Sequence, residues 1–106
     1  MKAIKAKSIN KSLMCLNSYS KEHNNFEIVS TIKQGKNCVK LEIKSQGNIF
    51  VLQLHTPFMC SFLWVGGLCF MFDEIKIDDK GIDLYKDCKY LVSLYSIKLQ
   101  ITRGLE

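Results

Sequence analysis

Residues 58–72 read FMCSFLWVGGLCFMF, and this stretch decides the fold. It carries no charge, holds four of the six Phe and the only Trp of the chain, and has Gly66-Gly67 near its centre. Two glycines between apolar runs predict a β-hairpin with a two-residue turn, because such turns need positive φ angles that Gly adopts freely. This turn sets a register in which Val65 faces Leu68.

The hairpin is apolar on both of its faces, so both faces need cover. A domain of 106 residues has few ways to cover both sides of one strand pair with its own core. The apolar surface that the core does not cover would then contact a partner protein, a second copy of the chain or a lipid interface. Four aromatic residues are the candidate partner-binding residues, namely Phe58, Phe62, Trp64 and Phe70.

On either side of the hairpin the hydrophobic period is two, which is typical of half-buried strands. The clearest example is 38–44, where Val39, Leu41 and Ile43 alternate with charged side chains. Pro57 interrupts the pattern, because proline has no N–H for a central strand position. A long final strand begins at residue 90 and bends near 93–96. The inward residues expected in the other strands are Phe26, Ile28, Ile32, Phe50, Leu52, Leu54, Ile75, Ile77, Ile82 and Leu84.

A short helix is expected before the strands. Residues 8–11 open the segment, Leu13, Leu16 and Tyr19 recur near helical spacing, and the two Asn at 24–25 end it. Together, seven strand signals joined by short polar turns predict a single mainly β (or α+β) domain. We expect an antiparallel meander curled into a barrel or folded into a sandwich, spanning residues 1–104. Residues 105–106 are typical of a cloning scar.

The charge is unevenly distributed along the chain. Residues 1–45 carry nine Lys against three acids, a net charge of +6, whereas residues 73–89 carry six acids against four Lys, a net charge of −2. A basic segment of this kind is a solvated surface or a contact for nucleic acid. The candidate nucleic-acid-binding residues are Lys33, Lys36, Lys40 and Lys44. Arg103 is the only arginine, which argues against sequence-specific DNA recognition.

Five cysteines occur in the chain, and no C-x-x-C pair is present. The odd number, the lack of zinc-ligand spacing and the lack of an N-terminal signal sequence predict free thiols in a reducing cytoplasm. In the hairpin register, Cys69 faces Trp64 and Cys60 faces Asp73, so the two thiols are not directly opposed. A disulfide between the two hairpin cysteines is therefore not expected.

The uncharged stretch 46–72 is long enough for a membrane helix, but polar residues, Pro57 and the two glycines interrupt it. No motif indicates an enzyme. His55 with Cys60 resembles a base and a nucleophile, but no third group or oxyanion loop accompanies them. The aspartates around Gly81 lack the order of a calcium loop and indicate a hairpin turn. We expect no catalytic residues, metal site, cofactor, small-molecule ligand or membrane contact.

Three classes of function remain. The favoured one is a non-catalytic protein-interaction module that holds a partner or a second copy of itself through the apolar hairpin. The alternative is a small basic barrel that binds nucleic acid without sequence preference. A small enzyme ranks last, because the chain shows no cluster of acid, base, nucleophile or metal ligands.

Overall fold

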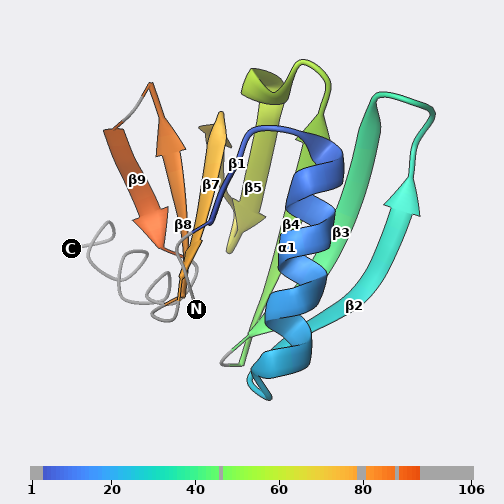
Figure 1. Ribbon diagram of the computed structural model, residues 1–106, viewed down its shortest axis with the longest axis vertical. Coiled ribbons are helices and arrows are strands. Elements are labelled where there is room, and N and C mark those ends of the chain that lie inside the picture. Colours follow the sequence, from blue (N-terminus) through green and yellow to red (C-terminus); the bar gives the residue numbers. More distant parts are fainter. Residues whose placement is uncertain (1–3, 46, 79–80, 88, 94–106) are drawn as a thin grey trace.

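The computed structural model describes residues 4–45, 47–78, 81–87 and 89–93 (Figure 1). Within them, one α-helix and nine strands follow each other along the chain. Their bounds are β1 Ile4–Ala6, α1 Ile9–Glu22, β2 Phe26–Lys33, β3 Cys38–Ser45, β4 Asn48–His55, β5 Ser61–Val65, β6 Leu68–Phe72, β7 Glu74–Asp78, β8 Gly81–Lys86 and β9 Lys89–Ser93, with a 3-10 turn, η1, at Phe58–Cys60.

The strands form two antiparallel sheets. The five-stranded sheet is a meander in the order β2-β3-β4-β5-β6, and the four-stranded sheet has the order β1-β7-β8-β9. In Figure 1, α1 lies in front of β3 and β4, and it also contacts β1 and β7. The expected mainly β fold with an N-terminal helix is confirmed. The sheets do not close into a barrel, and the sandwich alternative fits.

Strand alternation builds the core. Along β3 and β4 every second side chain is buried, and the side chains between them are half-buried or exposed, as the period of two predicts. The buried side chains of both sheets and of α1 form one hydrophobic cluster. The largest fully buried ones are Phe50, Phe72, Leu16, Leu41, Ile43, Leu52, Leu54, Leu63, Ile75, Ile77, Ile82 and Leu84.

The Gly66-Gly67 hairpin has the expected form. Val65 pairs with Leu68, and the two glycines have φ angles of 55° and 82°. Positive φ at both central residues is what a type I′ turn requires, so the sequence prediction of this turn is confirmed. The hairpin's first strand is shorter than the apolar run, however. Phe58–Cys60 form η1, in which the N–H of Cys60 donates to the Pro57 carbonyl over 3.1 Å.

A bulge in β2 changes which side chains face the core. Val29 is left unpaired, and the pairing of β2 with β3 shifts by one residue. Because side chains alternate along a strand, this shift turns the following ones to the opposite faces. Ile32 lies on the outer face and is 50% exposed, so the expectation that it shares a face with Phe26 is wrong. Lys33 lies on the inner side, opposite the buried Val39.

The helix begins at a capped end. Ser8 is the N-cap, and its hydroxyl accepts a hydrogen bond from the N–H of Lys11 over 3.3 Å. On the buried side of α1, Tyr19 packs edge-to-face against Phe26, with ring centroids 5.1 Å apart. The continuation of the final strand beyond Ser93, with its expected bend, lies outside the described residues.

Ser12 places a polar side chain in the buried side of α1. Its side chain is fully buried, and its hydroxyl makes no hydrogen bond to any residue that the structure describes. We expect Ser12→Ala to raise the free energy of unfolding by about 1 kcal/mol, because it removes an unpaired buried hydroxyl and favours the helix. Urea denaturation measures the change.

Ser20→Ala is the matched control in the same helix. The Ser20 hydroxyl donates to the Phe26 carbonyl over 3.3 Å, so this substitution is expected to lower the free energy of unfolding by about 1 kcal/mol. A loss of stability in Ser12→Ala would contradict the unpaired state of the Ser12 hydroxyl.

Candidate interaction surface

Five apolar side chains gather on the outer side of the five-stranded sheet. We call this group the open face; its members are Ile49, Val51, Phe62, Trp64 and Met71. Cross-strand pairing brings them together, since Val51 pairs with Trp64 and Phe62 pairs with Met71. Ile49, Trp64 and Met71 are 56%, 45% and 46% exposed, and the other two are half-buried. Contiguous exposed apolar side chains of this size indicate an interaction site.

Neighbouring side chains hold the two aromatic rings of the open face. The indole N–H of Trp64 donates to the Oε1 atom of Gln53 over 3.1 Å. The Phe62 ring packs edge-to-face against the His55 ring, with centroids 5.6 Å apart. Aromatic rings fixed in this way lose little conformational entropy on binding, which suits them as anchors of an interface.

Charged side chains of both signs border the open face. Lys40, Glu42 and Lys44 alternate with buried residues along β3, so they lie on the outer side of the sheet. Glu27 of β2 pairs directly with Lys44, and Glu42 pairs with Val51 of the open face. The border is therefore mixed in sign and close to neutral.

The four aromatic residues that were predicted from the sequence to bind a partner do not lie on one surface. Phe62 and Trp64 lie on the open face. Phe58 is buried and packs edge-to-face against Phe72, with centroids 5.8 Å apart. Phe70 pairs with the buried Leu63 on the inner side and packs against the core.

Sequence reasoning did not identify the other members of the open face, Ile49, Val51 and Met71. The β4 sequence IFVLQLH contains an indication of Ile49 and Val51, because the second face of this strand is also partly apolar.

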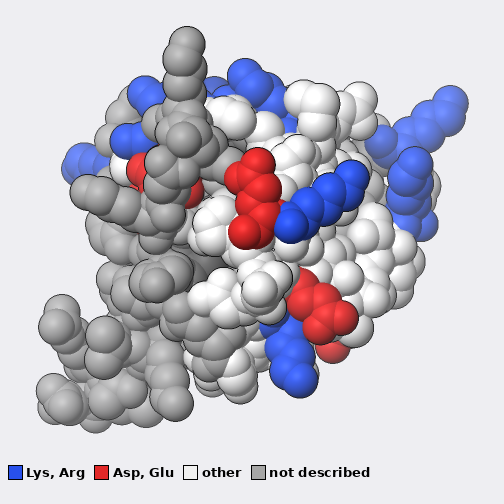
Figure 2. Space-filling view, turned by 60° about the horizontal axis from the view of Figure 1, so that its bottom comes forward, with Lys and Arg blue, Asp and Glu red and all other residues white. Residues whose placement is uncertain are grey.

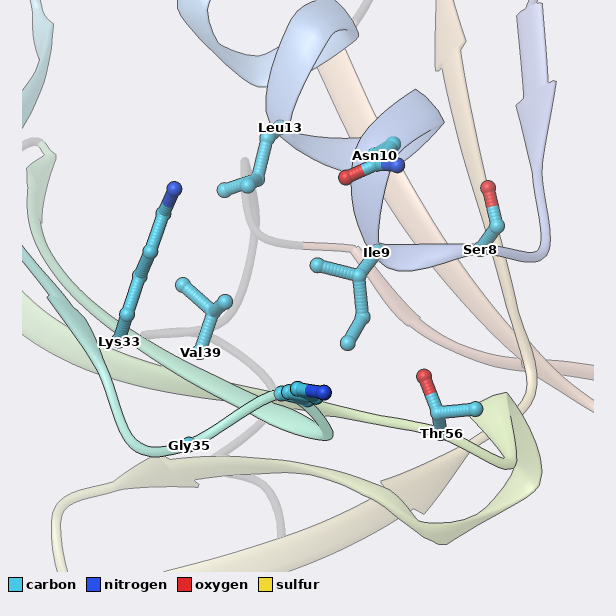
Figure 3. Close-up of a pocket in the computed structure, with 9 residues that line it drawn as sticks. Ser8, Ile9, Asn10, Leu13, Lys33, Gly35, Val39 and Thr56 are labelled. Carbon is cyan, nitrogen blue, oxygen red and sulfur yellow. The ribbon is translucent and has the colours of Figure 1, made fainter.

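The four candidate lysines do not form one patch. Lys40 and Lys44 share the outer side of β3, as the alternation predicts. Lys33 and Lys36 instead line a pocket of about 450 Å³ between the start of α1 and the β2–β3 turn. In Figure 3 the Lys33 side chain extends beside Val39 and Leu13, on the helix side of the sheet. The other lining residues of this pocket are Ser8, Ile9, Asn10, Gly35 and Thr56.

The wider charge pattern is also mixed. On the side of the molecule seen in Figure 2, Lys side chains are spread around the rim, and Asp and Glu side chains lie between them. Among the described residues, Lys7 and Glu74 form an ion pair, with 3.5 Å between Nζ and Oε2. No broad surface of a single sign is seen in this view, which disfavours tracking of a phosphate backbone over this side.

His55 has a different thiol neighbour from the one considered in the sequence. The Cys38 Sγ atom lies 3.8 Å from the Nε2 atom of His55, because the two residues are direct partners across β3 and β4. Cys60 lies exposed in η1. The four described cysteines, Cys15, Cys38, Cys60 and Cys69, are all free.

Searches with protein-family models, among curated proteins and among solved structures find no match to this chain. The functional conclusion therefore rests on the geometry of the open face. Among the described residues, no helix combines the length and apolar character needed to cross a membrane.

Proposed function

We propose that this protein is a non-catalytic interaction module that associates with a second copy of itself through the open face. The observation that carries the proposal is the exposure of Trp64 and Met71 beside Phe62, on the side of the sheet opposite the core. The inner side of β5 in the same hairpin is buried in the domain, whereas its outer side meets solvent. Contact with protein would remove this apolar surface from water, which is favourable by roughly 25 cal/mol per Å².

The charge pattern around the open face favours a second copy over a strongly charged partner. Lys40 and Lys44 on the border alternate with Glu42, so the same surface carries both signs within a few residues. In a two-fold symmetric pair each surface meets its own copy, and a border of mixed sign can then be complementary to itself. A partner of one strong charge would meet repulsion from half of this border.

The size of the sheet sets the expected affinity. Five strands spaced about 4.8 Å apart, with lengths of up to eight residues, span a plane of roughly 20 by 26 Å. Burial of such a plane on both copies approaches roughly 1,000 Å² in total, at the lower end of specific interfaces. We therefore expect a dissociation constant in the micromolar range.

Sedimentation equilibrium tests the proposal. The wild-type protein is expected to change from the mass of one chain to that of two as its concentration rises from nanomolar to several hundred micromolar. High salt is expected to leave this transition nearly unchanged, because apolar burial dominates. A single-chain mass at every concentration would overturn the proposal. The proposed compartment is the reducing cytoplasm, and the free described cysteines support it.

A second candidate function is non-specific binding of nucleic acid. One observation favours it: Lys40, Gln53 and Phe62 lie in one cross-strand row, which places a base-stacking ring near a phosphate-binding ammonium group. Glu42 lies on the same side of β3 as Lys40, and Lys33 and Lys36 lie elsewhere. This candidate therefore ranks second.

We expect no measurable binding of single-stranded oligonucleotides at physiological salt, because few phosphates reach a cation. If binding occurs at low salt, Lys40→Glu with Lys44→Glu is expected to weaken it by at least about tenfold, or about 1.4 kcal/mol. The free energy of unfolding should change by only about 0.5 kcal/mol for each exposed site. Fluorescence anisotropy measures the binding, and sub-micromolar affinity at physiological salt would reverse the ranking.

A further inference from the structure

A thiol and an imidazole lie together at one end of the outer side of the five-stranded sheet. The Cys38 Sγ atom is 3.8 Å from the His55 Nε2 atom and 3.5 Å from the Oε1 atom of Gln34. Both Cys38 and His55 are half-buried. In the described part of the chain no third His, Cys, Asp or Glu joins them to form a metal-binding group.

The pair is held by the fold. Cys38 and His55 are the last of eight directly opposed residue pairs between β3 and β4. The His55 ring packs edge-to-face against Phe62 at 89° between the ring planes, and the backbone N–H of His55 donates to the buried Ser61 hydroxyl over 3.1 Å. The strand pairing and this hydrogen bond position the His55 backbone. The contact with Phe62 orients the imidazole, whose Nε2 atom lies 3.8 Å from the thiol sulfur, so that a short movement allows proton transfer between them.

The described charge nearest to the pair along β3 is positive. Lys40 lies two residues along β3 on the same side of the sheet. The facing positions of the neighbouring elements are uncharged, namely Ile32 on β2, Gln53 on β4 and Phe62 on β5. The first carboxylate on this side of β3 is Glu42, roughly 13 Å from Cys38 along the strand. A nearby cation and imidazolium stabilise a thiolate, which is the reactive form of cysteine.

From this juxtaposition we infer that Cys38 is a modification site for peroxides, activated by His55. The imidazole takes the thiol proton, and the thiolate sulfur attacks one oxygen of the peroxide. An S–O bond forms, the O–O bond breaks, and the departing hydroxide takes the proton from the imidazolium to give water. Sulfur is oxidised to sulfenic acid by two electrons, and the peroxide is reduced. Cys38 lies on the same side of the sheet as the open face, so this inference applies to the single chain, at protein concentrations below the transition in mass.

The protein carries its own controls for the test. Cys60 and Cys69 are exposed, and no described histidine lies in hydrogen-bonding contact with either of them. If solvent access alone decided the rate of oxidation, these two thiols would react faster than the half-buried Cys38. A faster reaction at Cys38 would have to come from its chemical surroundings.

The experiment treats the native protein with limiting hydrogen peroxide, traps sulfenic acid with dimedone and quantifies each cysteine by peptide mass spectrometry. Cys38 is expected to be labelled at least about tenfold more than Cys60 or Cys69. Its alkylation by iodoacetamide at neutral pH should likewise be faster than that of the two exposed thiols. His55→Gln should bring Cys38 to the level of the other two, with an unchanged circular dichroism spectrum.

Equal labelling of the three thiols would overturn the inference. So would faster labelling of Cys38 that survives His55→Gln in the folded variant. If His55→Gln does not fold, the alkylation rates of the wild-type protein decide, and a rate at Cys38 no higher than those at Cys60 and Cys69 would overturn the inference equally.

Discussion

Phe72→Ala is expected to lower the free energy of unfolding by about 3–5 kcal/mol. Phe72 is fully buried, pairs with the buried Ser61 and packs edge-to-face against Phe58. Its removal leaves a cavity where the five-stranded sheet ends, and the rigid strands around it can close that cavity only in part. Urea denaturation at low protein concentration measures the loss without a contribution from association.

The matched control is Met71→Ala in the same strand. Met71 is 46% exposed on the opposite side of the sheet, so its truncation should change the free energy of unfolding by only about 0.5 kcal/mol. The contrast between the two substitutions tests the register of the hairpin, because a slip by one residue would exchange their faces. Equal losses, or a larger loss for Met71→Ala, would contradict the packing described here.

Trp64→Glu is expected to weaken self-association at least about 100-fold, or about 2.7 kcal/mol. Trp64 lies at the centre of the open face, between Val51 on one strand and Cys69 on the other. A carboxylate at this position would have to lose its hydration inside an apolar contact without a partner. Sedimentation equilibrium measures the shift in dissociation constant, and circular dichroism verifies the fold.

Met14→Glu is the control for an exposed apolar residue away from the open face. Met14 is 64% exposed on α1, on the other side of the five-stranded sheet, and its substitution should leave the dissociation constant unchanged. Trp64→Phe retains an apolar ring and should lose no more than about tenfold. Dissociation caused by Met14→Glu but not by Trp64→Glu would place the contact on the helix side and refute the role of the open face.

Local patterns made much of the fold predictable. The glycine pair at 66–67 determined the hairpin and its register, and the period of two in β3 and β4 gave their inner faces. Both signals depend only on residues close in sequence. The bulge at Val29 was not predictable, because no glycine or proline marks it, and its effect on Ile32 and Lys33 depends on pairing with β3. The packing into a sandwich depends on β1 pairing with β7, which lies far along the chain.

The candidate sites were predictable only in part, for the same reason. The apolar hairpin pointed to Phe62 and Trp64, but the strand that extends the open face, β4, joins them only through its pairing with β5. His55 was considered with Cys60, its near neighbour in sequence, whereas the β3–β4 register places it beside Cys38, which is 17 residues away.

The fluorescence of Trp64 tests the central proposal most directly. It is the only tryptophan in the chain, and it lies on the surface proposed to become buried, so its emission reports on that surface alone. The proposal predicts that the emission maximum moves to shorter wavelength, and that quenching by iodide weakens, as concentration rises through the transition in mass. A mass that doubles while emission and quenching stay constant would place the contact elsewhere and contradict the proposal.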